Sequence, residues 1–542
     1  MIETNALREK VLDLAIRGKL VPQNPNDEPA SVLLERIRAE KQQMVKDGKL
    51  KAKDIKNDTI IYKGEDNLHY EKFQVGTVKC IENEIPFELP EGWEWCRLLP
   101  LTIKIGAGST PTGGAAVYST SGIKFIRSQN VYDNGLVLND VAYISEEINQ
   151  KKSGSIVKPK DILLNITGGS IGRCALVPDD FDIANVNQHV IIIRLVNPEL
   201  REYLHDVITS PYIQEQILSR QVGSGRSGLS AETLSTFLIP LAPMNEQVSI
   251  IKKLQDCISY TLTIADVQRS ILDLVSTTRT KILDLAIRGK LVPQDPNDEP
   301  ASVLLGRIRA EKEELIKQGK IKSDKKESII FKGDDNSYYE TIGENTVCID
   351  ETIPYDLPIG WYWCKLKTLS APYDNSFVDG PFGSNLKTEH YTVNREVRII
   401  QLNNIGEFFW RNNGVKYTTF EHAETLKRCI SYPEDIVIAK MMPAGRTIII
   451  PHLEKKYVIS SDCVRLRLAK QINNKYVMYM LNSPIINSII SGDVHGIGRS
   501  RTSLSKLKEV TIPLPPRNEQ ERIVTAIETA FTQLDKIINA IS

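Results

Sequence analysis

Long blocks of this sequence occur twice in the chain, and that constrains its fold more than any other feature. Residues 8–30 read REKVLDLAIRGKLVPQNPNDEPA, and residues 279–301 read RTKILDLAIRGKLVPQDPNDEPA. The offset, taken from Lys10 to Lys281, is 271 residues, which is half of the 542 residues of the chain. A period this long is that of a whole domain rather than of one solenoid element. The chain is therefore predicted to fold as two copies of one unit.

Two further pairs of blocks repeat in the same order. Residues 90–96 (PEGWEWC) match residues 358–364 (PIGWYWC), and residues 239–247 (IPLAPMNEQ) match residues 512–520 (IPLPPRNEQ). Between these blocks the two copies diverge. We call the repeated blocks the frame and the unlike segments between the second and third blocks the inserts. This pattern indicates that the frame gives both units the same backbone arrangement, while each insert presents a different surface.

Apolar residues follow each closing block at spacings of three, four and seven, which predicts a long amphipathic helix with a coiled-coil-like seam. The helix after the first copy runs into the second copy. The helix after the second copy would be completed across the chain ends by residues 4–18. The predicted seam consists of Leu7, Val11, Leu14, Leu254, Ile258, Leu272, Ile527, Leu534 and Ile541.

Local signals predict where these helices stop and where the next ones start. Gly18 and Gly289, each followed by a proline four residues later, are typical of a helix C-terminus. The next helices are predicted over Ala30 to Gly48 and Ala301 to Gly319, with Ser31 and Ser302 suited to the N-cap positions because serine is a favoured N-cap residue.

The inserts contain short β-rich runs separated by Gly, Ser, Thr and Asn loops. We therefore expect an α/β (α+β) protein with two globular insert domains, separated by two long antiparallel coiled-coil-like helices in a pseudo-twofold, circularly permuted arrangement. The expected segments are an N-terminal helical region (1–60), a first insert domain (85–243), a central helical spacer (244–325), a second insert domain (350–515) and a C-terminal helix that pairs with the N-terminus (516–542).

Composition indicates the compartment but not the partner. The chain has 68 Lys and Arg against 68 Asp and Glu, so its net charge does not by itself indicate nucleic acid. Its apolar runs are too short to cross a bilayer, its first ten residues are polar rather than signal-like, and its 8 cysteines form no CxxC pair. We expect a cytoplasmic protein with reduced thiols.

The loops of both inserts carry side chains that can hydrogen-bond base edges or phosphates. In the first insert these are Ser109, Thr110, Thr112, Arg127, Ser128, Gln129, Asn130, Asn187, Gln188 and His189. In the second they are Ser384, Asn385, Lys387, Gln401, Asn403, Asn404, Lys440 and Arg446. Arginines in a Gly/Ser loop before each closing block suit a phosphate contact, namely Arg226, Arg499 and Arg501. Ordinary turn chemistry is the better explanation for any single one of the other residues, and an exposed arginine in a helix-start loop explains the arginines equally well.

Several blocks together carry a family resemblance. LxxAIRGKLVPQxPNDEPASVLLERIRAEK, PxGWxWC, GGSIGRCALV, DGPFGSNLK and PLxPxNEQ, in this order, resemble the specificity subunit of type I restriction-modification systems, and the resemblance covers essentially the whole chain. It implies two target-recognition domains held apart by helices, each reading one part of a bipartite asymmetric site in double-stranded DNA.

The same resemblance implies the partners. These are two modification subunits that methylate adenine with S-adenosylmethionine, and two ATP-dependent restriction subunits that translocate and cut DNA. S-adenosylmethionine, ATP and Mg are expected on those subunits, and this chain is expected to have no catalytic residue, metal or cofactor of its own.

Enzymatic alternatives find little support in the sequence. An amino-methyltransferase needs Pro-Pro followed by Tyr or Phe, but the prolines at 515–516 precede Arg517, and no Gly-Lys is followed by Ser or Thr as in a P-loop. Residues 433–435 and 454–456 form a short, permissive pattern similar to the acidic strands of many nucleases. A single-chain restriction-methylation enzyme is disfavoured, whereas a repeat scaffold that binds only proteins stays open because the chain has no net basic charge.

Overall fold

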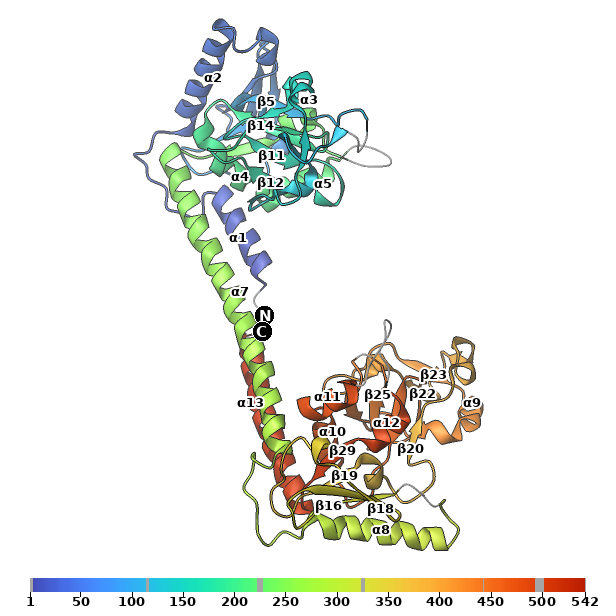
Figure 1. Cartoon of the computed structure of the whole chain (residues 1–542). Helices are drawn as coiled ribbons and strands as arrows, with labels where there is room; N and C mark the ends of the chain where they lie inside the picture. Colours follow the sequence, from blue (N-terminus) through green and yellow to red (C-terminus); the bar gives the residue numbers. More distant parts are fainter. Residues whose placement is uncertain are drawn as a thin grey trace. The chain divides into compact units, whose positions relative to one another are not determined.

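The computed structural model describes residues 3–113, 117–221, 228–322, 327–441, 443–492 and 502–541. It divides into two compact units, Met1–Gln268 and Arg269–Ser542, which are described separately (Figure 1). The division falls within α7 (Met244–Ile287), a single helix of 44 residues. The long helix predicted after the first closing block is confirmed. No helix in the described ranges is long and apolar enough to cross a membrane.

Each unit begins with the same pair of helices. In unit 1 these are α1 (Thr4–Ile16) and α2 (Ala30–Lys46), and in unit 2 they are the last turns of α7 and α8 (Ala301–Lys317). Gly18 and Gly289 follow the first helix with φ of 64° and 65°. This left-handed conformation is open to glycine at little cost, so the predicted helix stops are confirmed.

The predicted N-caps at Ser31 and Ser302 are wrong. α2 and α8 begin at Ala30 and Ala301, where the predicted helical segments begin, but the N-cap positions are occupied by prolines without a side-chain cap. The backbone carbonyls of Gly92 and Gly360, in the repeated Gly-Trp blocks, accept the first amide of each helix at 2.8 Å. A tertiary contact has replaced the local cap.

A small antiparallel sheet that was not predicted from the sequence follows in each unit. Unit 1 has β1 (Thr59–Lys63), β2 (His69–Phe73) and β3 (Val78–Cys80), and unit 2 has β16 (Ser328–Lys332), β17 (Tyr338–Ile342) and β18 (Asn345–Cys348). Asn67 and Asn336 occupy the left-handed region in the first hairpin turn of each sheet. Such an asparagine is the turn signal that could have predicted these hairpins.

The second and third repeated blocks pair directly. β4 (Glu94–Arg97) pairs with β15 (Leu238–Leu241), and β19 (Tyr362–Lys365) pairs with β29 (Thr511–Leu514), both antiparallel. In each unit the strand before the insert therefore pairs with the strand after it, so that the two ends of the insert lie side by side.

The two inserts have the same sheet plan. In unit 1 one sheet has the order β12-β11-β14-β5 and the other the order β10-β13-β6-β9. In unit 2 the matching sheets are β26-β25-β28-β20 and β24-β27-β22-β23-β21. In each unit one pair of strands, β13 with β6 or β27 with β22, is parallel.

The bounds in the first insert are β5 (Thr102–Ala107), β6 (Ile123–Ile126), β7 (Val131–Tyr132), β8 (Gly135–Leu136), β9 (Ala142–Ile144), β10 (Ile156–Val157), β11 (Ile162–Asn165), β12 (Cys174–Leu176), β13 (Ala184–Val186) and β14 (Val190–Leu195). Its helices are α3 (Glu146–Lys151), α4 (Arg201–Thr209), α5 (Pro211–Ser219) and α6 (Ala231–Ser235). The short 3-10 helix η5 (Ser128–Asn130) follows β6.

The bounds in the second insert are β20 (Phe377–Asp379), β21 (Tyr391–Thr392), β22 (Val397–Ile400), β23 (Lys416–Thr418), β24 (Ile430–Ser431), β25 (Ile436–Ala439), β26 (Thr447–Ile449), β27 (Tyr457–Ile459) and β28 (Cys463–Leu466). Its helices are α9 (Phe420–Thr425), α10 (Asn474–Leu481), α11 (Pro484–Gly492) and α12 (Leu504–Glu509), and η13 (Leu402–Asn404) follows β22. The closing helix is α13 (Arg517–Ile541).

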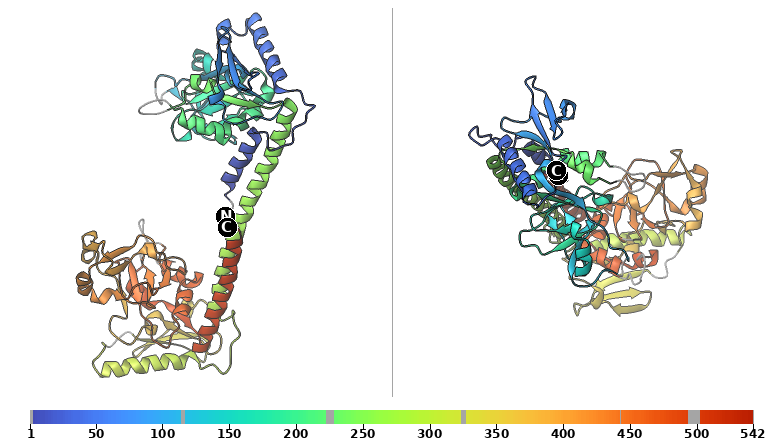
Figure 2. Two further views of the ribbon diagram at one scale, coloured as in Figure 1. Left: turned by 180° about the vertical axis from the view of Figure 1, so that it is seen from behind. Right: turned by 90° about the horizontal axis from the view of Figure 1, so that it is seen from above.

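Within unit 2, α13 runs antiparallel to the last part of α7, and the two lie side by side (Figures 1 and 2). The side chain of Arg279 contacts Asp535, whereas Gln294, after the end of α7, bonds to Glu519 near the start of α13. Leu283 and Ile287 pack in one core with Ile523 and other residues of α13. Within unit 1, Leu12 and Ile16 of α1 pack in one core with Leu254 and other residues of the first part of α7.

The residues predicted for the seam differ in burial. Leu254 and Ile527 are buried, Leu7 is 38% exposed, and the half-buried positions are Val11, Leu14, Ile258, Leu272, Leu534 and Ile541. α1 belongs to the core of unit 1, and its meeting with α13 across the chain ends stays a prediction.

The three repeated blocks meet at one buried carboxylate in each unit. The Glu246 carboxylate accepts the indole Nε1 of Trp93 at 2.9 Å and the amide Nε2 of Gln23 at 3.2 Å. In unit 2 Glu519 accepts from Trp361 and Gln294 at the same distances. Burial raises the pKa of both carboxyl groups. This shared contact gives the Pro-Gln, Gly-Trp and Asn-Glu-Gln motifs a structural reason to occur together.

Candidate nucleic-acid interface

In unit 1, five strands bring their loops to one edge of the insert domain. The registers Ala107 with Ile191 and Asn165 with Val190 align the ends of β5 and β11 with the start of β14. The ends of β6 and β13 lie beside them, because the backbone amide of Asn187 donates to the carbonyl of Ile126 at 3.1 Å. The loops leaving this edge hold most of the residues predicted for the first insert.

Four polar side chains in these loops form a connected row. Thr110 contacts the side-chain oxygen of Gln188, and Nε2 of Gln188 lies 3.1 Å from Nε2 of His189. Nδ1 of His189 lies 2.6 Å from the hydroxyl of Thr167. Gln188 is exposed, so its amide is held in place by two neighbours while remaining open to a ligand. The structure thus brings together residues that are up to 79 positions apart in sequence, from Thr110 to His189.

Two residues of this edge, Thr167 and Lys152, were not predicted from the sequence. Thr167 contacts His189, and Lys152 donates from Nζ to the hydroxyl of Ser109 at 2.7 Å. Thr167 lies two residues after the end of β11, so its place close behind a buried strand was the available signal. Lys152 ends a short helix and had no distinguishing signal in its sequence.

Some predicted residues of the first insert use their side chains within the domain. Asn130 is buried, accepts the backbone amide of Arg127 at 3.0 Å and donates to the carbonyl of Val137 at 2.9 Å. Asn187 is also buried, and it accepts the backbone amide of His189 at 3.0 Å. These two asparagines shape the loops, which is the turn chemistry considered above.

The others around η5 are more open. Gln129 is exposed and donates to the carboxylate of Asp140 at 3.2 Å, and Arg127 donates to the backbone carbonyl of the same residue at 3.2 Å. The backbone carbonyl of Ser128 accepts from Asn165 at 2.8 Å, and Thr112 lies in an exposed turn. Gln129 and Thr112 are therefore the accessible members of this group.

Unit 2 presents a cleft at the matching edge. The cleft has a volume of 670 Å³, and its lining includes two predicted residues, Asn385 and Lys440, together with Asp379. Nζ of Lys440 donates to Oδ1 of Asp379 at 2.8 Å. Ser384 stands next to the lining and donates to the side-chain oxygen of Asn385 at 3.2 Å. Asp379 was not among the predicted residues.

The remaining predicted residues of the second insert lie around this cleft or on η13. Asn404 is buried and repeats the role of Asn130, accepting the backbone amide of Gln401 at 2.9 Å. Asn403 and Lys387 are exposed, Gln401 is half-buried, and Arg446 is half-buried between β25 and β26. The predicted phosphate contacts Arg226, Arg499 and Arg501 lie outside the described residues.

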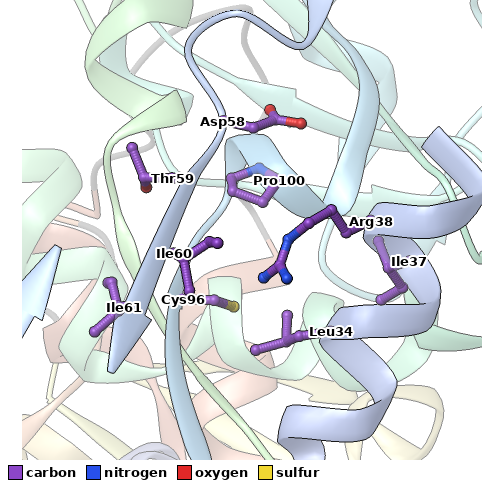
Figure 3. Close-up of a pocket in the computed structure, with 9 residues that line it drawn as sticks. All are labelled: Leu34, Ile37, Arg38, Asp58, Thr59, Ile60, Ile61, Cys96 and Pro100. Carbon is purple, nitrogen blue, oxygen red and sulfur yellow. The ribbon is translucent and has the colours of Figure 1, made fainter. Parts of the chain in front are cut away.

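A second cavity lies in the frame of unit 1, between α2, β1 and β4 (Figure 3). It measures 30 Å³ and is lined largely by apolar side chains, with Arg38 and Asp58 at its margin. This volume accommodates about one water molecule, which is too small for a ligand.

The acidic residues of the nuclease-like pattern are held by basic partners. Asp435 is bonded to Arg467 at 2.5 and 2.6 Å, and Glu454 to Arg395 at 2.9 Å. Within the described ranges, no three His, Cys, Asp or Glu side chains gather so that they could hold a metal ion. This pattern therefore serves the domain's own ion pairs.

Comparison with known proteins agrees with this architecture. The family model described as the type I restriction modification DNA specificity domain matches residues 90–271 and 392–542, more than half of the chain. The chain is 28% identical to the type I restriction enzyme EcoAI specificity subunit and 26% identical to the EcoEI specificity subunit, both from Escherichia coli. Each of these alignments covers 98% of this chain and 89% of the relative.

A solved chain of a type I R-M system shares the fold, with a TM-score of 0.53 and 18% identity over 84% of this chain and 94% of that one. Two insert domains on duplicated frames, the loop edge of each domain and the family match lead to one conclusion. This chain belongs to the family of type I restriction-modification DNA specificity subunits, the non-catalytic sequence-recognition part of such systems.

Proposed function

We propose that each insert domain reads one half of a bipartite, asymmetric site in double-stranded DNA. The observation that carries this proposal is the combination of like frames with unlike edges. Matching strands end at the same edge in both units, yet unit 1 presents Thr110, Gln188 and His189 there, whereas unit 2 presents a cleft around Asp379 and Lys440. Because the two edges present different hydrogen-bond donors and acceptors, they suit two different base sequences.

The chain would also position the other subunits of the system. We propose that two modification subunits and two restriction subunits assemble on it, one of each per repeated unit, and that α7 fixes the gap between the half-sites. S-adenosylmethionine, ATP and Mg would be held by those subunits. The working compartment would be the cytoplasm, where chromosomal and incoming DNA are accessible.

An exchange of one insert domain tests the proposal. Residues 97–240 are replaced by the matching segment of a related subunit, and the complex is expressed in a host free of other DNA methylation. Sequencing of methylated sites should show one changed half-site and one unchanged half-site. The reciprocal exchange of residues 365–513 is the matched control and should change the other half-site.

Two outcomes would contradict the proposal. A simultaneous change of both half-sites would defeat the assignment of one half-site to each domain. Unchanged half-sites after both exchanges would favour the alternative of a scaffold that binds only proteins.

A further inference from the structure

The cleft of unit 2 contains an ion pair whose position can be compared directly with unit 1. Lys440 is 7% exposed, and its ammonium lies 2.8 Å from a carboxylate oxygen of Asp379. Both residues line the 670 Å³ cleft, and both stand at the ends of strands, Asp379 closing β20 and Lys440 following β25.

The strand registers identify the matching residues in unit 1. Asp379 pairs with Val464 of β28, and Ala107 pairs with the matching position, Ile191 of β14. Lys440 is the first residue after β25 as Ile166 is the first after β11. The same two places therefore hold an ion pair in one unit and two apolar residues in the other.

The neighbouring glycines confirm this alignment. A Cβ on Gly108 would lie 1.8 Å from the backbone oxygen of Val186, and a Cβ on Gly380 would lie 1.8 Å from the backbone oxygen of Ser460. Directly after Ala107 and Asp379, both loops thus approach the backbone at the end of a neighbouring strand, β13 or β27, equally closely.

A second buried ion pair shows how an interaction shared by the sheets of both inserts behaves. Arg467 bonds to Asp435 in unit 2, and Arg194 bonds to Asp161 in unit 1, with both carboxylates buried. This pair is present in both units because it holds the shared sheet. The Asp379 and Lys440 pair occurs in one unit alone, and the sheet of unit 1 forms without it.

We infer that Asp379 and Lys440 read one G·C base pair in the half-site of the second domain, an inference that rests on the proposed function. The ammonium of Lys440 has three donors, so that one stays on Asp379 while the others reach O6 and N7 of guanine. The second carboxylate oxygen of Asp379 accepts the N4 amino group of cytosine. A phosphate is a poorer fit, because the carboxylate beside Lys440 repels it.

The test replaces the pair by the residues of unit 1. Asp379→Ala with Lys440→Ile is introduced into the full chain and assembled with its partner subunits, and the methylated sites are sequenced. The half-site of the second domain should lose its preference for G·C at one position, by about 5- to 150-fold, as expected for one good base contact. The half-site of the first domain should not change.

A matched control removes an ion pair of the same unit that lies away from the cleft. Lys475→Ala with Glu528→Ala deletes the contact between α10 and α13, where the atoms are 2.5 Å apart, and should leave both half-sites unchanged. An unchanged half-site in the Asp379 and Lys440 variant, a change at an A·T position, or assembly without any methylation would overturn the inference.

If the double variant does not assemble with the partner subunits, the single variant Asp379→Asn tests the same inference. Asparagine keeps the shape but offers an amide donor, so discrimination between C and T at that position should weaken. An unchanged preference would overturn the inference. If the domain exchanges leave both half-sites unchanged, the proposed function fails, whereas working exchanges with an unaffected Asp379→Asn complex defeat this inference alone.

Discussion

The ammonium of Lys41 lies 2.7 Å from the carboxylate of Asp58, and both residues are buried, with 2% and 7% of their surface exposed. Lys41 also donates to the backbone carbonyl of Leu99 at 3.1 Å. Burial lowers the pKa of Lys41 and raises that of Asp58. The pair ties α2 to the start of β1. In unit 2 the matching Lys312 donates to the carbonyl of Thr368 at 2.9 Å, so the backbone contact is shared.

Asp58→Ala should destabilise unit 1 by about 3–5 kcal/mol, because it leaves the Lys41 charge buried without its partner. The double variant Lys41→Met, Asp58→Leu should be less destabilised than Asp58→Ala, since no charge is then buried. Hydrogen exchange of the α2 amides in the full chain measures both effects. A double variant as unstable as the single one would contradict this account.

Glu246→Gln should remove a pH dependence of unit 1. The raised pKa of Glu246 lies above its unfolded value of about 4.3. Its contribution to stability is therefore fully present below that value and is lost as pH rises through the folded pKa. Urea unfolding between about pH 4 and pH 7 should show the advantage of the native chain over Glu246→Gln shrinking as pH rises. Glu232→Gln, at an exposed position of α6, is the control. Parallel curves for Glu246→Gln and the native chain would refute this prediction.

In the first insert domain, Gln188→Ala should affect the DNA-sequence preference, whereas Asn130→Ala should affect the stability of the fold. Gln188 is exposed, so its loss should relax one position of one half-site without changing stability. Asn130 is buried with both polar ends bonded, so its loss should cost about 1–3 kcal/mol and leave the preference of folded complexes intact. Methylation mapping and thermal unfolding distinguish the two variants, and the reverse pattern would show that these roles are wrongly assigned.

Deletion of residues 1–18 should weaken unit 1 itself. Leu12, Ala15 and Ile16 are buried in the core that also holds Ile250 and Leu254 of α7. Each buried Leu or Ile contributes roughly 1.5–3 kcal/mol, so the loss is several kcal/mol. Limited proteolysis should cut within residues 85–243 of the deleted protein and spare the second insert domain, whose matching residues come from α7. Equal resistance of both domains would contradict this expectation.

The isolated chain should bind DNA weakly. Equal numbers of acidic and basic residues leave little of the general attraction to phosphate that dominates non-specific affinity. Partner subunits should raise the affinity by at least an order of magnitude at one fixed salt concentration, as measured by fluorescence anisotropy. The same affinity with and without them would count against this view.

The sequence by itself determined the duplicated architecture. The repeated blocks predicted the two units, and the spacing of apolar residues predicted the helices α7 and α13. Gly18 and Gly289 predicted where the helices end. These predictions were possible because each signal is local or is repeated in the chain. The N-cap of α2 was wrongly predicted because the Gly92 carbonyl, a tertiary partner, accepts the first amide of the helix.

Only the tertiary structure decided which polar residues meet. Asn130 and Gln129 are neighbours with the same chemistry in sequence, yet one is buried in a turn and the other is exposed. Asp379 and Lys440 are 61 positions apart, and their contact depends on two strands ending beside the same third strand. Register and burial arise from packing across the sheets, and a single sequence records neither the partner strand nor the side of the turn that faces the core.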